Sequence, residues 1–208
     1  MQKPFLIGLT GLSGSGKTTF LKQLEAALGT DHLCVISQDN YYKPKEAQHV
    51  DSKGIHHFDR PDSLYREDFF RDIHRLMSGQ IVRREEYTFN NQLARPTMLE
   101  FAPKPLILVE GLFVFYYEEI RKLIDLKLFL QVQETTAFSR RIRRDQIERN
   151  YPLDDVLYRY EQHVLPTYYQ LIKPFQHQAD LVINNNQNFD KALQVLIAYL
   201  KAQLNGHN

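Results

Sequence analysis

The segment GLTGLSGSGKTTF, residues 8–20, joins an apolar run to a helix-like pattern through a loop rich in glycine. Gly11, Gly16, Lys17 and Thr18 match the pattern G-x-x-x-x-G-K-S/T, which binds phosphate where it follows a strand and opens a helix. Glycines let backbone N–H groups point at phosphate oxygens, and the helix N-terminus adds a partial positive charge. A flexible glycine turn is the alternative, which the strand–loop–helix context disfavours.

We therefore expect this loop to bind a nucleoside triphosphate. Lys17 is expected to reach the β- and γ-phosphates, and the Thr18 hydroxyl is expected to bind Mg²⁺. The residues predicted to surround the phosphates are Gly11, Ser13, Gly14, Ser15, Gly16, Lys17, Thr18 and Thr19.

Five short runs rich in Ile, Leu, Val and Phe predict strands, at residues 4–10, 32–37, 105–110, 126–132 and 180–184. Most of them are continuously apolar, as expected of parallel strands that are covered on both faces. Helical patterns separate them, at residues 17–28, 63–79, 134–150, 153–175 and 189–204, with Ser63 or Asp62 as the predicted N-cap of the second. The alternation predicts an α/β fold of the P-loop NTPase type, a doubly wound parallel sheet of about five strands with helices on both faces. We expect residues 1–208 to form one domain.

Residues 40–104 break this alternation. They contain two turn-rich stretches, a helix and the segment QIVRREEYTFNN, in which Tyr87 and Phe89 alternate as in a short hairpin. We interpret the region as an insertion over the carboxyl edge of the sheet, where ligands of α/β proteins bind. Residues 134–152 are expected to form a helical lid.

Composition excludes several classes of partner. The 208 residues include 26 basic and 25 acidic side chains, for a formal net charge of +1, so no global charge favours nucleic acid or an anionic membrane. The N-terminus lacks the long apolar stretch of a signal peptide, and no apolar run is long enough to span a bilayer. The expected location is cytoplasmic.

Two acids follow predicted strands at the edge where the phosphates would lie. Glu110 ends the run LILVE, where its carboxylate could hold Mg²⁺ directly or through water, although a surface acid at a strand end is the alternative. Asp39 follows the second strand and could accept the proton of an acceptor hydroxyl, but an aspartate before asparagine is also common in turns. From position alone both interpretations of Asp39 stay open.

The run SRRIRRDQIER predicts a basic helix. Such a run is ordinarily a solvated face, but a transferring phosphoryl group also needs positive charge from a movable lid. Arg141 and Arg144 share one helical face and are the strongest candidates, followed by Arg149. A small chain with an inserted acceptor region favours a kinase of a small molecule over a GTPase switch, because no guanine-binding N-K-x-D pattern is present.

Several motifs together resemble the uridine kinase (uridine–cytidine kinase) family. They run in family order over roughly residues 5–185 and include GLSGSGKTT, ISQDNYYK, HFDRPDSL, EYTFNN and RRIRRDQIERN. The resemblance implies phosphorylation of the 5′-hydroxyl of a pyrimidine ribonucleoside, uridine or cytidine, in pyrimidine salvage. It implies ATP or GTP as phosphate donor, Mg²⁺ as cofactor, and a homo-oligomer, either a tetramer or a dimer.

The resemblance also implies roles for individual residues. Asp39 would be the catalytic base near the metal, assisted by Lys17 and Arg144, and Thr18, Asp39 and Glu110 would be the metal ligands. Asp59 would bind the ribose 2′- and 3′-hydroxyls, since a carboxylate is suited to accept from a diol. Arg141 would reach the sugar, and Arg144 and Arg149 the phosphates. The nucleoside pocket would be lined by Tyr42, Phe58, Tyr87 and Phe89, residues that would otherwise be interpreted as core.

The chain departs from the family pattern where the family contacts the base. Gln92 stands where the family usually has histidine, Asn150 and Tyr151 stand where it has Gly-Arg, and Arg159 stands where a glutamine is expected. A glutamine amide can donate and accept, so Gln92 could still meet uracil or cytosine. Tyr151 and Arg159 could together form a replacement clamp on the base. Phosphoryl transfer is therefore a firmer expectation than base preference.

Two alternatives stay open. The same fold could phosphorylate another small acceptor such as nicotinamide riboside, although Asp59 favours a substrate with a vicinal diol. A non-catalytic nucleotide-binding regulatory protein is the second alternative, against which the retention of Lys17, Thr18, Asp39 and Glu110 counts.

Overall fold

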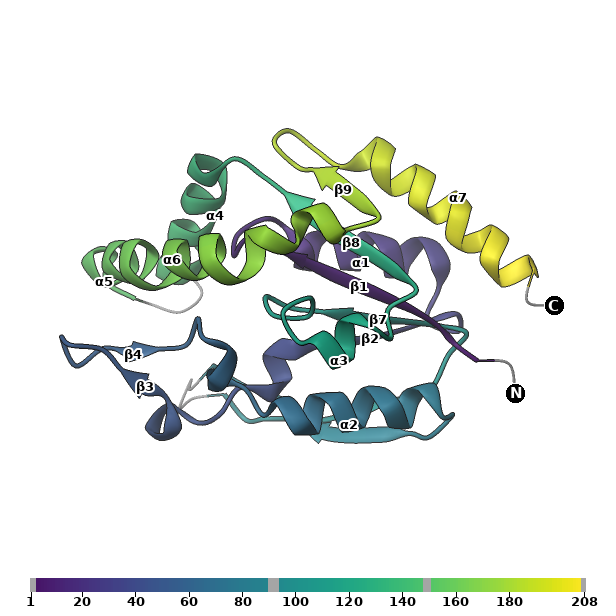
Figure 1. Ribbon diagram of the computed structural model, residues 1–208, viewed down its shortest axis with the longest axis horizontal. Coiled ribbons are helices and arrows are strands. Elements are labelled where there is room, and N and C mark those ends of the chain that lie inside the picture. Colours follow the sequence, from purple (N-terminus) through teal and green to yellow (C-terminus); the bar gives the residue numbers. More distant parts are fainter. Residues whose placement is uncertain (1–2, 90–93, 148–150, 207–208) are drawn as a thin grey trace.

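The computed structural model describes residues 3–89, 94–147 and 151–206, and its centre is a five-stranded parallel sheet (Figure 1). The strands are β1 (Phe5–Gly11), β2 (Leu33–Ser37), β7 (Leu106–Glu110), β8 (Leu126–Gln131) and β9 (Leu181–Asn184). Their order across the sheet is β2-β7-β1-β8-β9, with every neighbouring pair parallel. The five predicted strands and the parallel sheet are confirmed.

The apolar runs form strands because both faces of the sheet are covered. All five residues of β7 are buried, and successive residues of β1 belong to opposite cores: Leu6 packs on one face, while Ile7 and Leu9 pack on the other. A strand buried on both sides has no position for an alternating polar residue, which explains the continuous apolar pattern.

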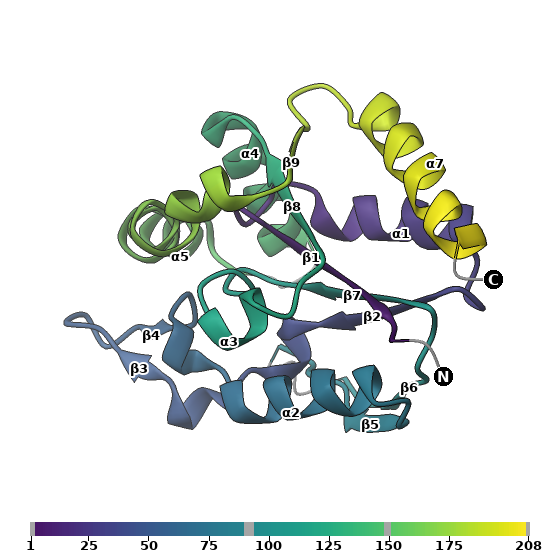
Figure 2. The ribbon, with the colours of Figure 1, turned by 45° about the vertical axis from the view of Figure 1, so that its right-hand side comes forward.

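Helices cover both faces, as the prediction required (Figures 1 and 2). One face packs against α1 (Lys17–Leu28) and α7 (Asp190–Gly206), through residues such as Leu24 and Leu196. The other face packs against α2 (Arg66–Met77), the segment containing α3 (Glu118–Arg121), and the helical segment at 153–178. Within the described ranges, none of the helices is both long enough and apolar enough to cross a bilayer.

The helical segment at 153–178 mixes three helix types. It comprises α5 (Leu153–Arg159), a π-helical turn (Tyr160–Val164), α6 (Leu165–Thr167), a second π-helical turn (Tyr168–Ile172) and a 3₁₀ segment (Lys173–Gln178). Pro166 lies in α6, between the two π-helical turns. Because proline has no N–H to donate, a regular α-helical hydrogen-bond ladder cannot run through it. The predicted basic helix is α4 (Glu134–Ile147).

The region between β2 and β7 forms small elements, only some of which lie at the expected carboxyl edge of the sheet, because α2 packs on one face. It contains the antiparallel pair β3 (His49–Val50) and β4 (His56–His57), helix α2, and the antiparallel pair β5 (Val82–Glu85) and β6 (Met98–Phe101). The latter pair lies beside α2 (Figure 2). Tyr87 and Phe89 follow β5 instead of alternating within a strand, so that part of the hairpin prediction is wrong.

The start of α2 also differs from the prediction. Residues Pro61–Ser63 form a separate 3₁₀ turn, and α2 begins at Arg66. The Ser63 hydroxyl donates to the carbonyl oxygen of His57 at 3.0 Å, so it does not cap the helix.

Gly111 allows a close approach at the end of β7. A Cβ atom at this position would lie 2.4 Å from Cβ of Gln38, in the turn that follows β2. The Gln38 side chain is buried and accepts a hydrogen bond from the backbone N–H of Phe113 at 2.9 Å. The glycine therefore lets the connections after β2 and β7 pack directly on each other.

We predict that Gly111→Ala lowers the free energy of unfolding by about 1–3 kcal/mol, because the added methyl group overpacks against Gln38. Urea unfolding monitored by circular dichroism measures the effect. An unchanged unfolding midpoint would show that the Gln38 turn can shift without loss.

Candidate active site

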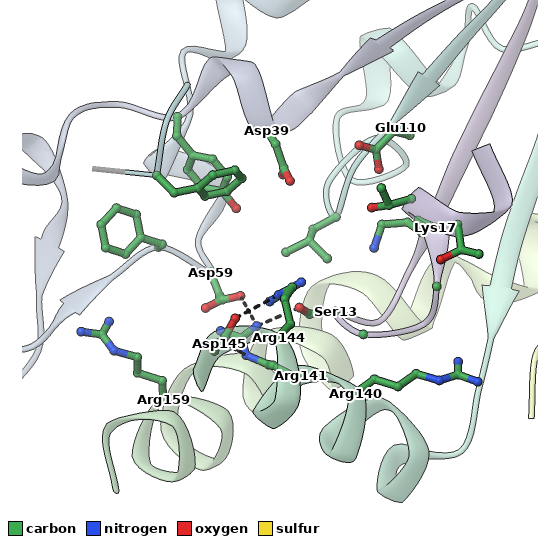
Figure 3. Close-up of a pocket in the computed structure, with 18 of the residues that line it drawn as sticks. Ser13, Lys17, Asp39, Asp59, Glu110, Arg140, Arg141, Arg144, Asp145 and Arg159 are labelled. Atoms are coloured by element: carbon green, nitrogen blue, oxygen red, sulfur yellow. Dashed lines mark hydrogen bonds and ion pairs between the residues drawn. The ribbon is translucent and has the colours of Figure 1, made fainter. Parts of the chain in front are cut away.

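Three neighbouring strands bring the predicted phosphate loop and two acids to one edge of the sheet. The register places Leu9 of β1 opposite Glu110 of β7, and Glu110 opposite Ser37 of β2. The chain then continues into the phosphate loop after β1 and into the turn carrying Asp39 after β2. A cavity of about 520 Å³ opens here, and Figure 3 shows the side chains that surround it.

The cavity is lined by many of the residues predicted from sequence. These are Ser13, Gly14, Gly16, Lys17, Thr18, Thr19, Asp39, Tyr42, Phe58, Asp59, Tyr87, Phe89, Glu110, Arg141, Arg144, Tyr151 and Arg159. Gly11 and Ser15 belong to the same loop but do not line the cavity, and Ser15 is fully buried. Gln92 and Arg149 lie outside the described residues.

The loop has the backbone that a phosphate cradle requires. Gly14 and Gly16 have φ angles of 84° and 98°, in the region that favours glycine. A Cβ atom on Gly14 would lie 2.4 Å from the carbonyl oxygen of Ala137 in α4. Gly16 is the N-cap of α1 and provides no side chain to cap it, so the first N–H groups of the helix stay available to a phosphate.

Lys17 lies at the end of the cavity formed by the phosphate loop. Its Nζ donates to the carbonyl oxygen of Gly11 at 3.2 Å, within the loop itself. Burial lowers the pKa of Lys17, while the negative charges of Glu110 and Asp39 oppose that shift. The two acids thus help to keep the ammonium group charged.

Ser37 links the two acids. Its hydroxyl donates to the carboxylate of Glu110 and accepts from the backbone N–H of Asp39 at 3.2 Å. Burial raises the pKa of Glu110, and the charge of Asp39 adds to that shift. Both carboxylates face the cavity beside Lys17 (Figure 3).

The oxygens of Thr18, Asp39 and Glu110 form a donor set that fits Mg²⁺. This ion prefers oxygen ligands and is commonly held by one or two carboxylates together with phosphate oxygens and water. Among the described residues, no group of three or more His, Cys, Asp or Glu side chains could hold a metal ion by itself. A cation here would therefore depend on the phosphates of a bound nucleotide for part of its coordination.

Arg141 connects three parts of the site. From α4, its Nη1 donates to Oγ of Ser13 at 2.8 Å and lies 3.7 Å from Oδ1 of Asp59. Its Nε lies 3.1 Å from Oδ2 of Asp145, which also accepts from Nε of Arg144 at 2.9 Å through its other oxygen. Arg141 is buried, whereas the side chain of Arg144 is 31% exposed and so is the more accessible cation.

Aromatic rings form the wall beyond Asp59. The ring of Tyr42 lies 6.2 Å from that of Phe58 and 5.4 Å from that of Tyr87, measured between centroids. The Tyr87 and Phe89 centroids are 5.2 Å apart. Phe89 has a φ angle of 53°, an uncommon conformation for a residue other than glycine, which holds the ring at the wall.

Sequence reasoning missed four residues that line the cavity, namely Lys22, Leu112, Arg140 and Asp145. Arg140 was visible in the basic run, but nothing in the run separates it from an exposed neighbour. Its Nη2 donates to the carbonyl oxygen of Asn185 at 3.3 Å, and its Nη1 is buried without a hydrogen-bond partner among the described residues. It lies beside the phosphate loop (Figure 3).

Arg84 was also missed, although it does not line the cavity. From β5, its Nε donates to the carbonyl oxygen of Asn40 at 2.7 Å, and its guanidinium carbon lies 3.7 Å from the centroid of the Tyr41 ring. The Tyr41 hydroxyl donates to Asp72, a buried acid of α2, at 2.9 Å. Arg84 therefore stabilises the turn that carries Asp39 through a contact outside the cavity.

Two stacked histidines, His57 and His163, lie next to Asp59. His57 stacks on His163 with ring centroids 3.9 Å apart, and Nε2 of His163 lies 2.8 Å from Oδ2 of Asp51. Nδ1 of His57 accepts from the backbone N–H of Asp59 at 3.2 Å. Burial lowers the pKa of His57 to about 4, and the neighbouring His163 adds to the shift.

This pKa predicts a loss of stability in mild acid. In the folded chain His57 stays neutral down to about pH 4, whereas in the unfolded chain it binds a proton near its ordinary value of 6.5. Its contribution to stability is therefore complete above pH 6.5 and is lost as the pH falls towards 4. We expect His57→Gln to lose less thermal stability than the wild type over this interval, as measured by circular dichroism melts. Parallel losses in both proteins would contradict the assignment to His57.

Comparison with known proteins adds independent findings. The profile of the Phosphoribulokinase / Uridine kinase family matches residues 6–199. A uridine kinase from Borrelia duttonii is 35% identical over 196 residues, which is 94% of each chain. A uridine kinase from Brevibacillus brevis is 33% identical over 183 residues, covering 88% of this chain and 86% of that protein.

A solved structure supports the fold. Phosphoribulokinase from Rhodobacter spheroides superposes with a TM-score of 0.60 at 17% identity, covering 88% of this chain and 70% of that chain. At this identity the match concerns the arrangement of strands and helices alone.

Proposed function

The chain belongs to the Phosphoribulokinase / Uridine kinase family and is a kinase, and we propose that it phosphorylates the 5′-hydroxyl of a pyrimidine ribonucleoside, uridine or cytidine, with ATP as donor. Two relatives that match most of the chain carry the name uridine kinase, which supports a nucleoside as acceptor. The cytoplasmic location, the homo-oligomer and the use of GTP stay expectations from the sequence.

The single observation that carries the proposal is the order of groups along the cavity. Lys17 and the phosphate loop lie at one end, Asp39 follows, and Asp59 lies beyond it towards the aromatic wall (Figure 3). A nucleoside presents its groups in the same order, with the 5′-hydroxyl first, then the ribose diol, then the base. The cavity therefore matches a nucleoside lying with its 5′-hydroxyl towards the phosphate loop.

In this proposal Asp39 accepts the proton of the acceptor hydroxyl. The carboxylate is half-buried, and phosphoryl transfer demands mainly alignment and charge stabilisation from the protein. Lys17, the N-terminus of α1 and the partly exposed Arg144 would stabilise the charge on the transferring group. Mg²⁺, when bound by Thr18, Asp39 and Glu110, would neutralise charge on the phosphate oxygens.

Asp59 and Arg141 would orient the ribose. A carboxylate can accept from both hydroxyls of a vicinal diol, and the contact with Arg141 positions the Asp59 carboxylate at the cavity. The rings of Tyr42, Phe58, Tyr87 and Phe89 would pack against the base, and Tyr151 and Arg159 would contact its polar edge. A vicinal diol site also suits nicotinamide riboside, but no contact of the described residues favours that acceptor.

We predict that Asp39→Asn keeps nucleotide binding and lowers phosphoryl transfer by about 10²- to 10⁴-fold, because the amide cannot accept the proton. Formation of ADP in the presence of uridine or cytidine measures transfer. The thermal shift caused by a non-hydrolysable ATP analogue measures binding, since a ligand of the folded state raises the midpoint.

Asp31→Asn is the matched control, because the Asp31 side chain is 94% exposed and precedes β2, whereas Asp39 follows the opposite end of the same strand. It should leave both readings unchanged. Normal turnover by the Asp39 variant would remove Asp39 as the base. Failure of the wild type to phosphorylate any nucleoside would remove the proposed function.

A further inference from the structure

We propose that Arg159 selects bases that carry an oxo group on the edge remote from the ribose, and so makes the enzyme prefer uridine to cytidine. The inference rests on the proposed function and specifies its substrate. Arg159 places a positive charge in the part of the cavity where the proposed nucleoside would bind.

The position of the base follows from the order of groups in the cavity. With the 5′-hydroxyl at Asp39 and the ribose diol at Asp59, the base must extend away from Lys17. The residues that line this far end are Tyr42, Phe58, Tyr87, Phe89, Tyr151 and Arg159. Figure 3 shows Arg159 beyond Asp59, on the side opposite the phosphate loop.

Arg159 is held in place from two sides. Its Nη1 donates to the carbonyl oxygen of His56 in β4 at 2.7 Å, and its guanidinium carbon lies 5.6 Å from the centroid of the Tyr151 ring. The side chain therefore crosses from α5 to the β3–β4 hairpin at the cavity wall. Fixing the guanidinium in advance reduces the entropy lost when it binds a ligand.

No ion pair to Arg159 is formed by the residues that the structure describes. Its Nε is buried and has no hydrogen-bond partner, and no carboxylate within the described ranges lies at ion-pair distance from it. Three acids around this end of the cavity have other partners: Asp59 and Asp145 contact Arg141, and Asp51 contacts His163. A half-buried guanidinium without an acid partner calls for hydrogen-bond acceptors from the ligand.

A guanidinium can only donate hydrogen bonds and does not lose its proton. The O4 atom of uracil is an acceptor and matches it. The 4-amino group of cytosine is a donor, so it would face donors and leave both sides unpaired in a partly desolvated site. The tyrosine hydroxyls of the wall can donate or accept, so among the described lining residues Arg159 is the one that fixes polarity at this end.

The test compares kcat/KM for uridine and cytidine in the wild type, in Arg159→Gln and in Arg75→Gln. We expect the wild type to favour uridine by roughly 10- to 100-fold, the effect of a charged hydrogen bond that one base makes and the other cannot. A glutamine amide donates and accepts, so Arg159→Gln should lose uridine activity and bring the ratio close to one.

Arg75→Gln is the matched control, because Arg75 is exposed on α2 and contacts only the Gln80 side chain at 3.3 Å among side-chain partners of the described residues. It should keep the wild-type ratio. Thermal shifts with each nucleoside and a non-hydrolysable ATP analogue should follow the same order as kcat/KM, which separates base recognition from a change in the chemical step.

Two results would overturn the inference while leaving the proposed function intact. The first is equal kcat/KM for uridine and cytidine in the wild type. The second is an Arg159→Gln variant that loses activity on both nucleosides equally, which would show that Arg159 only ties α5 to the hairpin. A wild type that phosphorylates neither nucleoside would instead overturn the proposed function, and this inference with it.

Discussion

The charge balance around the buried ammonium group of Lys17 is the constraint on which the rest of the site depends. Burial alone would favour the neutral amine, and Glu110 and Asp39 oppose that tendency. Lys17 in turn counteracts the effect of burial and of Asp39 on Glu110. The three groups must therefore lie close together, and the parallel register of β1, β7 and β2 achieves this without any long side-chain reach.

Arg141 is the second buried cation of the site, and it connects segments that lie outside the sheet. It contacts Ser13 in the phosphate loop, Asp59 in the insertion and Asp145 in its own helix. These groups lie far apart in the sequence, and the Arg141 guanidinium is the buried cation that contacts all three. The donor end and the acceptor end of the cavity thus share one buried cation.

Much of this arrangement could be predicted from sequence because it has a local signature. The strands appear as continuous apolar runs, and the phosphate loop has a fixed spacing of glycines before Lys17. Other features have no local signature. Arg84 supports the Asp39 turn through a contact with Asn40 that spans 44 residues. Nothing in the sequence VRRE of β5 distinguishes Arg84 from its neighbour Arg83. Tyr87 and Phe89 alternate as strand residues do, yet they follow the strand, where Tyr87 packs against Tyr42 and Phe89 packs against Tyr87.

Neither the β3–β4 hairpin nor α5 contributes a described residue to the two hydrophobic cores of the sheet. The β3–β4 hairpin meets α5 and the turn after it through side chains, among them Arg159 to the His56 carbonyl and His163 to Asp51. Arg159 belongs to neither hydrophobic core. Side chains of these two elements can therefore be exchanged without leaving a cavity in either core.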